Sequence, residues 1–132
     1  MPLVRISLRQ GRPPGFGKAI GQIVYEAMVD TFTVPPNDLF QIISEHNSEQ
    51  LVYDPSYLGI ERSVDFIVIQ ATVSEGRTVE RKQQFYKTLV ERLSQTLAVR
   101  PQDVFINLVE VKKENWSFGN GIAQYVTPAA AA

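Results

Sequence analysis

Three residues that lie far apart in the sequence, Pro2, Asp38 and Arg77, could together carry out acid–base chemistry. Once Met1 is removed, Pro2 presents a secondary amine, which acts as a general acid when protonated and as a base or nucleophile when neutral. A neighbouring carboxylate such as Asp38 stabilises the protonated amine, whereas a guanidinium such as Arg77 disfavours it and can bind a substrate carboxylate. Each residue also has a structural interpretation, since proline is tolerated at a strand start and aspartate and arginine are common in turns. The chemistry therefore depends on a fold that brings the three together.

The composition narrows the class of protein. The chain has 132 residues, a net charge of −1, one histidine and no cysteine. Near-neutral charge is not typical of a protein that binds nucleic acid or an anionic membrane surface, and the missing cysteines exclude disulfides and thiolate chemistry. No apolar run approaches the ~20 residues of a membrane span. We expect a single cytoplasmic domain over residues 1–132 that uses neither a metal nor another cofactor.

A strand–helix–strand pattern occurs twice, over about residues 2–48 and 64–115. Apolar spacing predicts helices at 16–32 and 78–97, and the tail at 127–132 is given no structural role. The two units align at an offset of 65 residues without a gap from Gly11 to Glu45. Nine positions are identical, where chance would give about two. These are Gly11/Gly76, Arg12/Arg77, Glu26/Glu91, Thr31/Thr96, Val34/Val99, Pro36/Pro101, Asp38/Asp103, Phe40/Phe105 and Glu45/Glu110.

A duplicated βαβ unit predicts an α/β (α+β) fold with a four-stranded sheet and two helices on one face. Each crossover should be right-handed, with its two parallel strands adjacent. The same element order also fits a ferredoxin-like fold, which differs in strand order. The strands are too apolar for the second sheet face to meet water, so we expect that oligomerisation covers it.

This fold would gather the three chemical residues at one edge of the sheet. Pro2 begins the first strand and Asp38 is expected to begin the second, and parallel strands start at the same edge. If the third strand runs antiparallel to the first, the turn that carries Arg77 arrives beside Pro2. The repeat predicts that this happens once per chain, because Ile67, the counterpart of Pro2, has no free amine.

A strand that opens with proline after methionine, the segment "LRQGR" and the βαβ unit resemble the tautomerase superfamily. The segments "YEAMVDTFTVPPND", "KQQFYKTL" and "ENWSFGNG" are similar to those of its malonate semialdehyde decarboxylases, and the resemblance covers residues 2–126. It implies a tautomerase-like trimer in which Pro2 is the catalytic group, with Asp38 and Arg77 beside it. The apolar wall of the site falls on Trp116, Phe118 and Tyr125. One departure is Glu75, which stands where those decarboxylases carry a first arginine.

The resemblance implies decarboxylation of malonate semialdehyde (3-oxopropanoate) to acetaldehyde and CO2, with cationic Pro2 as general acid and Arg77 holding the carboxylate. Two alternatives stay open. One is a tautomerase or hydratase of 2-oxo acids that uses Pro2 as a base. The other is a non-catalytic oligomeric module, in which Pro2 is an edge residue and the aromatic residues near the C-terminus belong to the core or an interface. The expected partners are a small 3-oxo or 2-oxo carboxylic acid and further copies of the chain.

Overall fold

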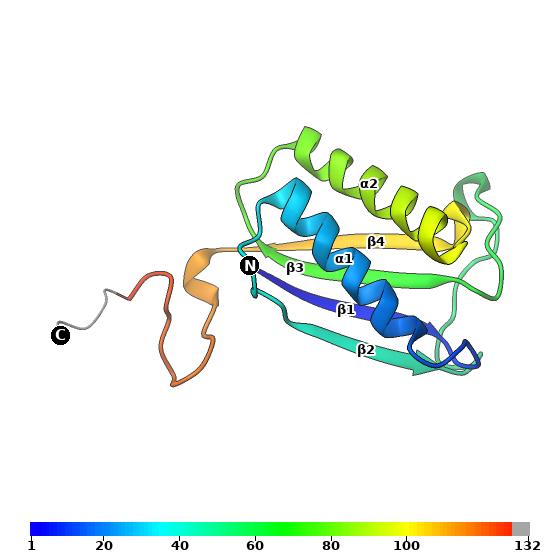
Figure 1. The fold of residues 1–132 in the computed structure, drawn as a ribbon, viewed down its shortest axis with the longest axis horizontal. Helices are drawn as coiled ribbons and strands as arrows, with labels where there is room; N and C mark the ends of the chain where they lie inside the picture. The colour runs from blue at the N-terminus through cyan, green and yellow to red at the C-terminus, as the bar shows by residue number, and fades with distance from the viewer. Residues whose placement is uncertain (128–132) are drawn as a thin grey trace.

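The computed structural model describes residues 1–127, so all of the expected tail except Thr127 lies outside the described residues. Its strands and helices follow one another along the chain in the order that the sequence predicts (Figure 1). They are β1 (Pro2–Arg9), α1 (Phe16–Phe32), β2 (Gln41–His46), β3 (Ile67–Ser74), α2 (Val79–Leu97) and β4 (Val104–Val111), with 3-10 turns at Tyr57–Gly59, Pro101–Asp103 and Lys113–Asn115.

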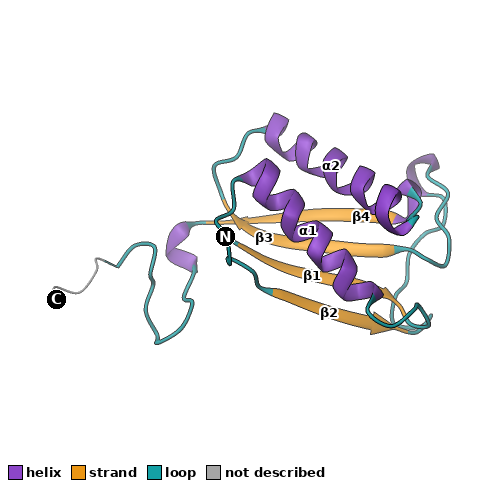
Figure 2. Ribbon diagram, in the orientation of Figure 1, coloured by secondary structure: helices purple, strands orange, loops and turns teal. Residues whose placement is uncertain are grey.

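The four strands form one sheet in the order β2-β1-β3-β4, and both helices lie across the same face of it (Figure 2). β1 runs parallel to β2 and β3 runs parallel to β4, while β1 and β3 pair antiparallel at the centre. In each unit the two parallel strands are direct neighbours. This arrangement confirms the predicted fold and excludes the ferredoxin-like alternative, which is a split βαβ arrangement.

The two halves of the sheet are related by a pseudo-two-fold axis. Arg5 pairs directly with Gln70 across the β1–β3 ladder, and these residues are counterparts in the repeat. The register also repeats, because Val4 faces Gln41 in one half and Ile69 faces Ile106 in the other. The structure therefore contains one βαβ unit twice. Because β1 and β3 are antiparallel, they begin at opposite ends of the sheet.

The second strand starts later than expected, so the prediction that Asp38 begins it is wrong. Pro35 and Pro36 precede a turn in which Asn37 has a φ of 69°, and the amide of Asp38 donates to the carbonyl of Pro35. Prolines lack a backbone N–H and cannot contribute a donor to the ladder. Asp38 thus belongs to the turn before β2, so the direction of its side chain is not set by the in–out alternation of strand residues.

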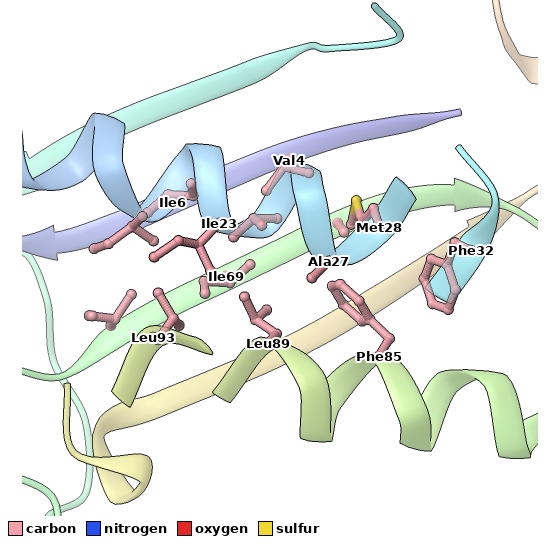
Figure 3. Close-up of a cluster of buried hydrophobic side chains, with 14 of the residues drawn as sticks. Val4, Ile6, Ile23, Ala27, Met28, Phe32, Ile69, Phe85, Leu89 and Leu93 are labelled. Carbon is pink, nitrogen blue, oxygen red and sulfur yellow. The ribbon is translucent and has the colours of Figure 1, made fainter. Parts of the chain in front are cut away.

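The core lies between the helices and the sheet (Figure 3). Alternate residues of β1 point into it, which gives the regular alternation of buried and less buried positions along this strand. From α2, Phe85, Leu89 and Leu93 are fully buried, and the ring of Phe85 lies 4.7 Å from that of Phe32. Burying side chains of this size stabilises the fold by about 1.5–3 kcal/mol each.

The opposite face of the sheet carries apolar side chains that no described residue covers. Ile42, Phe105 and Val109 all lie on this face, and they are 41%, 47% and 38% exposed. A single chain seldom leaves such a patch open without using it for an interaction. Within residues 1–127, neither helix combines the length and the apolar character that crossing a membrane would require.

Candidate active site

The start of β1, the turn after α1 and the turn between β3 and α2 meet at one edge of the sheet. The N-terminus lies at this edge, which is also where the chain leaves β4 (Figure 1). The α-amino nitrogen of Met1 is 3.8 Å from Oδ2 of Asp38. A cavity of about 550 Å³ opens beside it, lined by Met1, Phe32, Thr33, Val34, Pro35, Ser74, Glu75, Gly76, Arg77, Thr78, Arg81, Lys113 and Tyr125.

Two smaller hollows adjoin the same edge. Asp38 lines one of about 360 Å³ together with Met1 and Tyr125. Pro2 is buried in the sheet edge and lines the other, of about 330 Å³, with Trp116 and Phe118. The structure therefore brings all six predicted site residues to one end of the sheet. Arg77 and Pro2 line different hollows, and Met1, the residue before Pro2, lines the cavity that Arg77 lines.

Asp38 is a buried carboxylate. It is only 8% exposed, and neither of its carboxylate oxygens accepts a hydrogen bond from residues 1–127. Burial raises the pKa of Asp38, and the positive charge of the Met1 amine opposes that rise. A buried carboxylate in this state destabilises the fold, which is typical of a group kept for chemistry rather than for stability.

Arg77 is fixed by backbone carbonyls. Its guanidinium donates to the carbonyls of Ser74, at 3.0 Å, and of Phe32, at 3.3 Å, and lies 4.6 Å from the centre of the Phe32 ring. Gly76 has a φ of 118°, a conformation that favours glycine and turns the chain out of β3. Among residues 1–127 no acidic side chain lies within ion-pair distance of Arg77. Its positive charge is available to an anion in the cavity.

The environment lowers the basicity of an amine at this place. The pKa of the Met1 amine lies below its ordinary value because burial disfavours its cation. Asp38 opposes this shift, and the positive charge of Arg77 adds to it. The protonation state of the amine is therefore set by a balance between burial and these two side chains. Within the described part of the chain, no three acidic or histidine side chains group closely enough to hold a metal ion.

The aromatic residues after β4 form a small stack. The rings of Trp116 and Phe118 are stacked at 5.6 Å, and Tyr125 meets Phe118 edge-on at 5.1 Å. The indole nitrogen of Trp116 donates to Oγ of Ser74 at 3.1 Å, which ties this segment to the end of β3. The segment thereby forms an apolar wall beside residues 1 and 2.

Sequence reasoning missed two residues of the site. Phe40 is 47% exposed, lies 6.0 Å from Phe118 and lines the hollow beside Pro2. Phe40 is identical to its repeat counterpart Phe105, and this identity indicated only a strand residue. Both side chains are in fact exposed. The second missed residue is Arg81, which lines the 550 Å³ cavity with Arg77. Its position in the first turn of a helix gave no sign of this.

The opposite end of the sheet contains the repeat counterparts of the same residues, and there they are neutralised. Arg12 pairs with Asp65 at 2.7 Å and lies over the ring of Phe16. Asp103 accepts hydrogen bonds from the amide of Ser63 at 2.7 Å and from its hydroxyl at 2.6 Å. The two ends share a backbone arrangement, but within the described chain the end that holds the N-terminus leaves Arg77 without an acidic partner and Asp38 without a hydrogen bond.

Comparisons with known proteins agree with this fold. A family described as "Tautomerase enzyme" matches residues 38–119, and a second family with the same description matches residues 2–60. Probable tautomerase YusQ of Bacillus subtilis (strain 168) is 38% identical over 126 residues, which are 96% of this chain and 99% of that protein. A crystal structure of malonate semialdehyde decarboxylase is 35% identical, with a TM-score of 0.86 over 93% of this chain and 95% of the other. A fused 4-OT trimer is 21% identical, with a TM-score of 0.75 over 93% and 97%, and shares the fold.

Proposed function

The chain belongs to the tautomerase family, and on that premise we propose that it decarboxylates malonate semialdehyde to acetaldehyde and CO2. The amine of Pro2, freed by removal of Met1, would serve as the general acid. The observation that carries this proposal is the buried carboxylate of Asp38, 3.8 Å from the N-terminal amine and without a hydrogen bond from residues 1–127. The similarity to a malonate semialdehyde decarboxylase over 93% of the chain supports it.

The chemistry needs a cation beside the carbonyl oxygen of the substrate. When the C–C bond to the carboxylate breaks, its electrons move toward the aldehyde and form an enolate. A protonated amine that donates to the aldehyde oxygen stabilises this charge, and the carbon that lost CO2 then takes up a proton from solvent to give acetaldehyde. Asp38 favours the protonated form of the amine that this step requires.

Removal of Met1 would do two things. While Met1 is attached, the nitrogen of Pro2 is part of a tertiary amide and has neither a proton to give nor basic character. Met1 also lines both the 550 Å³ and the 360 Å³ cavities. Its loss would place the amine on Pro2 and open a path between the Arg77 and Asp38 sides of the site.

Arg77 would hold the substrate carboxylate, and the aromatic wall would exclude water. Guanidinium groups bind carboxylates through paired N–H donors. The edge where the amine lies is surrounded by Trp116, Phe118 and Tyr125. An apolar environment favours the reaction because the charged carboxylate leaves as neutral CO2.

One observation favours a second candidate, in which Pro2 acts as the base of a 2-oxo acid tautomerase or hydratase. Burial lowers the pKa of the Met1 amine, which adjoins Pro2, and a neutral amine is the active form of a base. The similar protein YusQ is named as a tautomerase, and the work on the similar decarboxylase describes decarboxylase and hydratase activities. A non-catalytic module has less support, since a buried carboxylate without hydrogen bonds would only weaken it.

We also propose that the chain forms a homotrimer. The open face of the sheet exposes Ile42, Phe105 and Val109, and oligomerisation would bury them. The related fused 4-OT protein, which shares the fold, is a trimer. The cytoplasmic location stays a prediction.

The test is to supply malonate semialdehyde to protein whose mass shows the loss of Met1, and to follow acetaldehyde through a coupled dehydrogenase. We expect acetaldehyde release that falls by about 100-fold or more in Pro2→Ala, in line with loss of a general acid. Arg12→Gln, which changes the counterpart of Arg77 at the opposite end, is the matched control and should retain full activity.

The other outcomes separate the alternatives. No release from correctly processed protein would overturn the decarboxylase proposal, and ketonisation of a 2-oxo acid enol by the same sample would establish the base candidate. Absence of both reactions, with Pro2→Ala indistinguishable from the wild type, would leave the oligomeric module.

A further inference from the structure

The cavity beside the N-terminus contains a second guanidinium. Arg81 lies in the first turn of α2 and lines the cavity together with Arg77. Its Nη1 donates to the carbonyl of Thr31 at 3.1 Å and lies 3.5 Å from the hydroxyl of Thr33. We propose that Arg81 binds the substrate carboxylate jointly with Arg77 and takes the place of the arginine that Glu75 replaces. This inference rests on the proposed function, because it concerns the acid group of the same substrate.

The end of α1 positions both arginines. Arg77 donates to the carbonyl of Phe32, and Arg81 donates to the carbonyl of Thr31. The last carbonyls of a helix lack partners within it and carry partial negative charge, so they attract cations. No basic residue lies in the last turn of α1 itself. The two cations therefore come from the β3–α2 turn and from the first turn of α2, and one helix end binds both.

Both groups keep donors for a ligand. A guanidinium has five N–H donors in a planar fork. The described residues engage two nitrogens of Arg77 and one nitrogen of Arg81. The remaining N–H groups are sufficient for each arginine to contact a carboxylate, which accepts through two oxygens.

The pair has no acidic partner at ion-pair distance in the described chain, and the more distant negative charge of Glu110 acts on Arg77. The positive charge of Arg81 contributes to lowering the pKa of Arg77, after burial. Neither arginine forms an ion pair with an acidic residue among residues 1–127. Glu75 lines the cavity but is not within ion-pair distance of them, and Glu110 is bound by Lys82. Two adjacent like charges disfavour each other, and an anionic ligand would relieve this.

The opposite end of the sheet has the same backbone arrangement but lacks the second arginine. Phe16 is the repeat counterpart of Arg81, and its ring covers the guanidinium of Arg12. Arg12 is neutralised by Asp65. One arginine, one carboxylate and one aromatic ring thus form a closed set there. At the N-terminal end Arg81 stands at the position of Phe16, Arg77 lies over the ring of Phe32 instead, and the place of the carboxylate is open to a substrate.

The test measures binding without turnover, so it stands apart from the decarboxylase assay. Propanoate is titrated into protein without Met1, and the side-chain Nε–H signals of the arginines are followed by NMR. We expect saturable binding that Arg81→Gln weakens about tenfold, the loss of one charged contact, while Arg81→Lys keeps most of it. Propanamide, which has the same size and no charge, should bind more weakly than propanoate to the wild type.

Two further variants make the result specific. Arg81→Phe copies the residue of the opposite end, keeps an apolar cover at the helix end and should lose propanoate binding as Arg81→Gln does. Arg92→Gln removes an arginine of the same helix that pairs with Asp30, and it should bind propanoate like the wild type. Propanoate affinity within twofold of the wild type in Arg81→Gln would overturn the proposal, as would the absence of saturable propanoate binding by the wild type. Because no step requires decarboxylation, a failed decarboxylase assay leaves this result interpretable.

Discussion

Replacing Asp38 by asparagine removes one charge and little volume from the side of the N-terminal amine. The amine of Met1 lies 3.8 Å from Oδ2 of Asp38, and Pro2 is the next residue. Two unit charges at this distance interact by about 1 kcal/mol in water and by about 4 kcal/mol at the effective dielectric of a protein surface. One pKa unit corresponds to about 1.36 kcal/mol. Since the amine of Pro2 lies one residue further along the chain, we expect its pKa to fall by about one to two units in Asp38→Asn.

The pKa is measured on processed protein labelled with ¹⁵N-proline, by titrating the Pro2 nitrogen. If Pro2 is a general acid, the lower pKa leaves less of the active cation at pH 7, and decarboxylation should fall by about tenfold or more. If Pro2 is a base, the same change raises the active fraction, and tautomerisation should hold or increase. A Pro2 pKa that stays within about 0.3 units of the wild type would refute the role assigned to Asp38. Asp30→Asn, which neutralises the exposed partner of Arg92, is the control.

The Asp38→Asn variant should be more stable than the wild type at neutral pH. Burial raises the pKa of Asp38, because the folded protein favours the protonated carboxyl group. The stability that goes with this protonated form is fully present below the ordinary value of 3.8 and is lost as the pH rises through the folded-state pKa. Asparagine does not titrate, and its free energy of unfolding should exceed that of the wild type at pH 7 and match it near pH 3. Urea unfolding at the two pH values measures this, and equal stability at pH 7 would contradict it.

Three further predictions concern other parts of the molecule. Phe85→Ala should lower the free energy of unfolding by about 3–5 kcal/mol because it empties the centre of the core, and a loss below about 1 kcal/mol in urea unfolding would contradict the packing. Ser74→Ala should cost about 1 kcal/mol and shift the fluorescence of the single tryptophan, Trp116, to longer wavelength, because its indole loses a partner. An unchanged emission spectrum would show that the bond does not hold the segment. Asp65→Asn should leave KM unchanged and cost at most about 1 kcal/mol, since it breaks a partly exposed ion pair at the opposite end; a raised KM would show that this end contributes to turnover.

Much of the fold could be predicted because it is written in local patterns. The apolar spacing gave α1 its observed bounds, Phe16–Phe32, and the offset of 65 residues identified the second βαβ unit. Strand order was not determined by these patterns, since the ferredoxin-like arrangement has the same sequence of elements. The start of β2 was misplaced because the two prolines and Asn37 form a turn that an apolar pattern does not register.

The site was predictable only in part. Pro2, Asp38 and Arg77 could be found because the repeat fixes which strand ends share an edge. Arg81 could not, because the direction of its side chain is set by the carbonyl of Thr31 on another helix, a tertiary contact that helix periodicity does not encode. Phe40 was missed for the same reason, since its ring packs against a segment almost eighty residues later in the chain.

The neutralised end of the sheet has a consequence for engineering this chain. Ser63 and Asp65 act there as tethered ligands: the segment that joins the two repeats delivers a donor to Asp103 and a carboxylate to Arg12. The segment that joins the repeats is therefore bound to Asp103 and Arg12 at that end of the sheet. A circular permutant opened just before Ile67 would release the tether and create an amino terminus at the place that Pro2 occupies in the other half. The duplicated scaffold thus keeps the counterparts of Asp38 and Arg77 closed by connectivity rather than by a different fold.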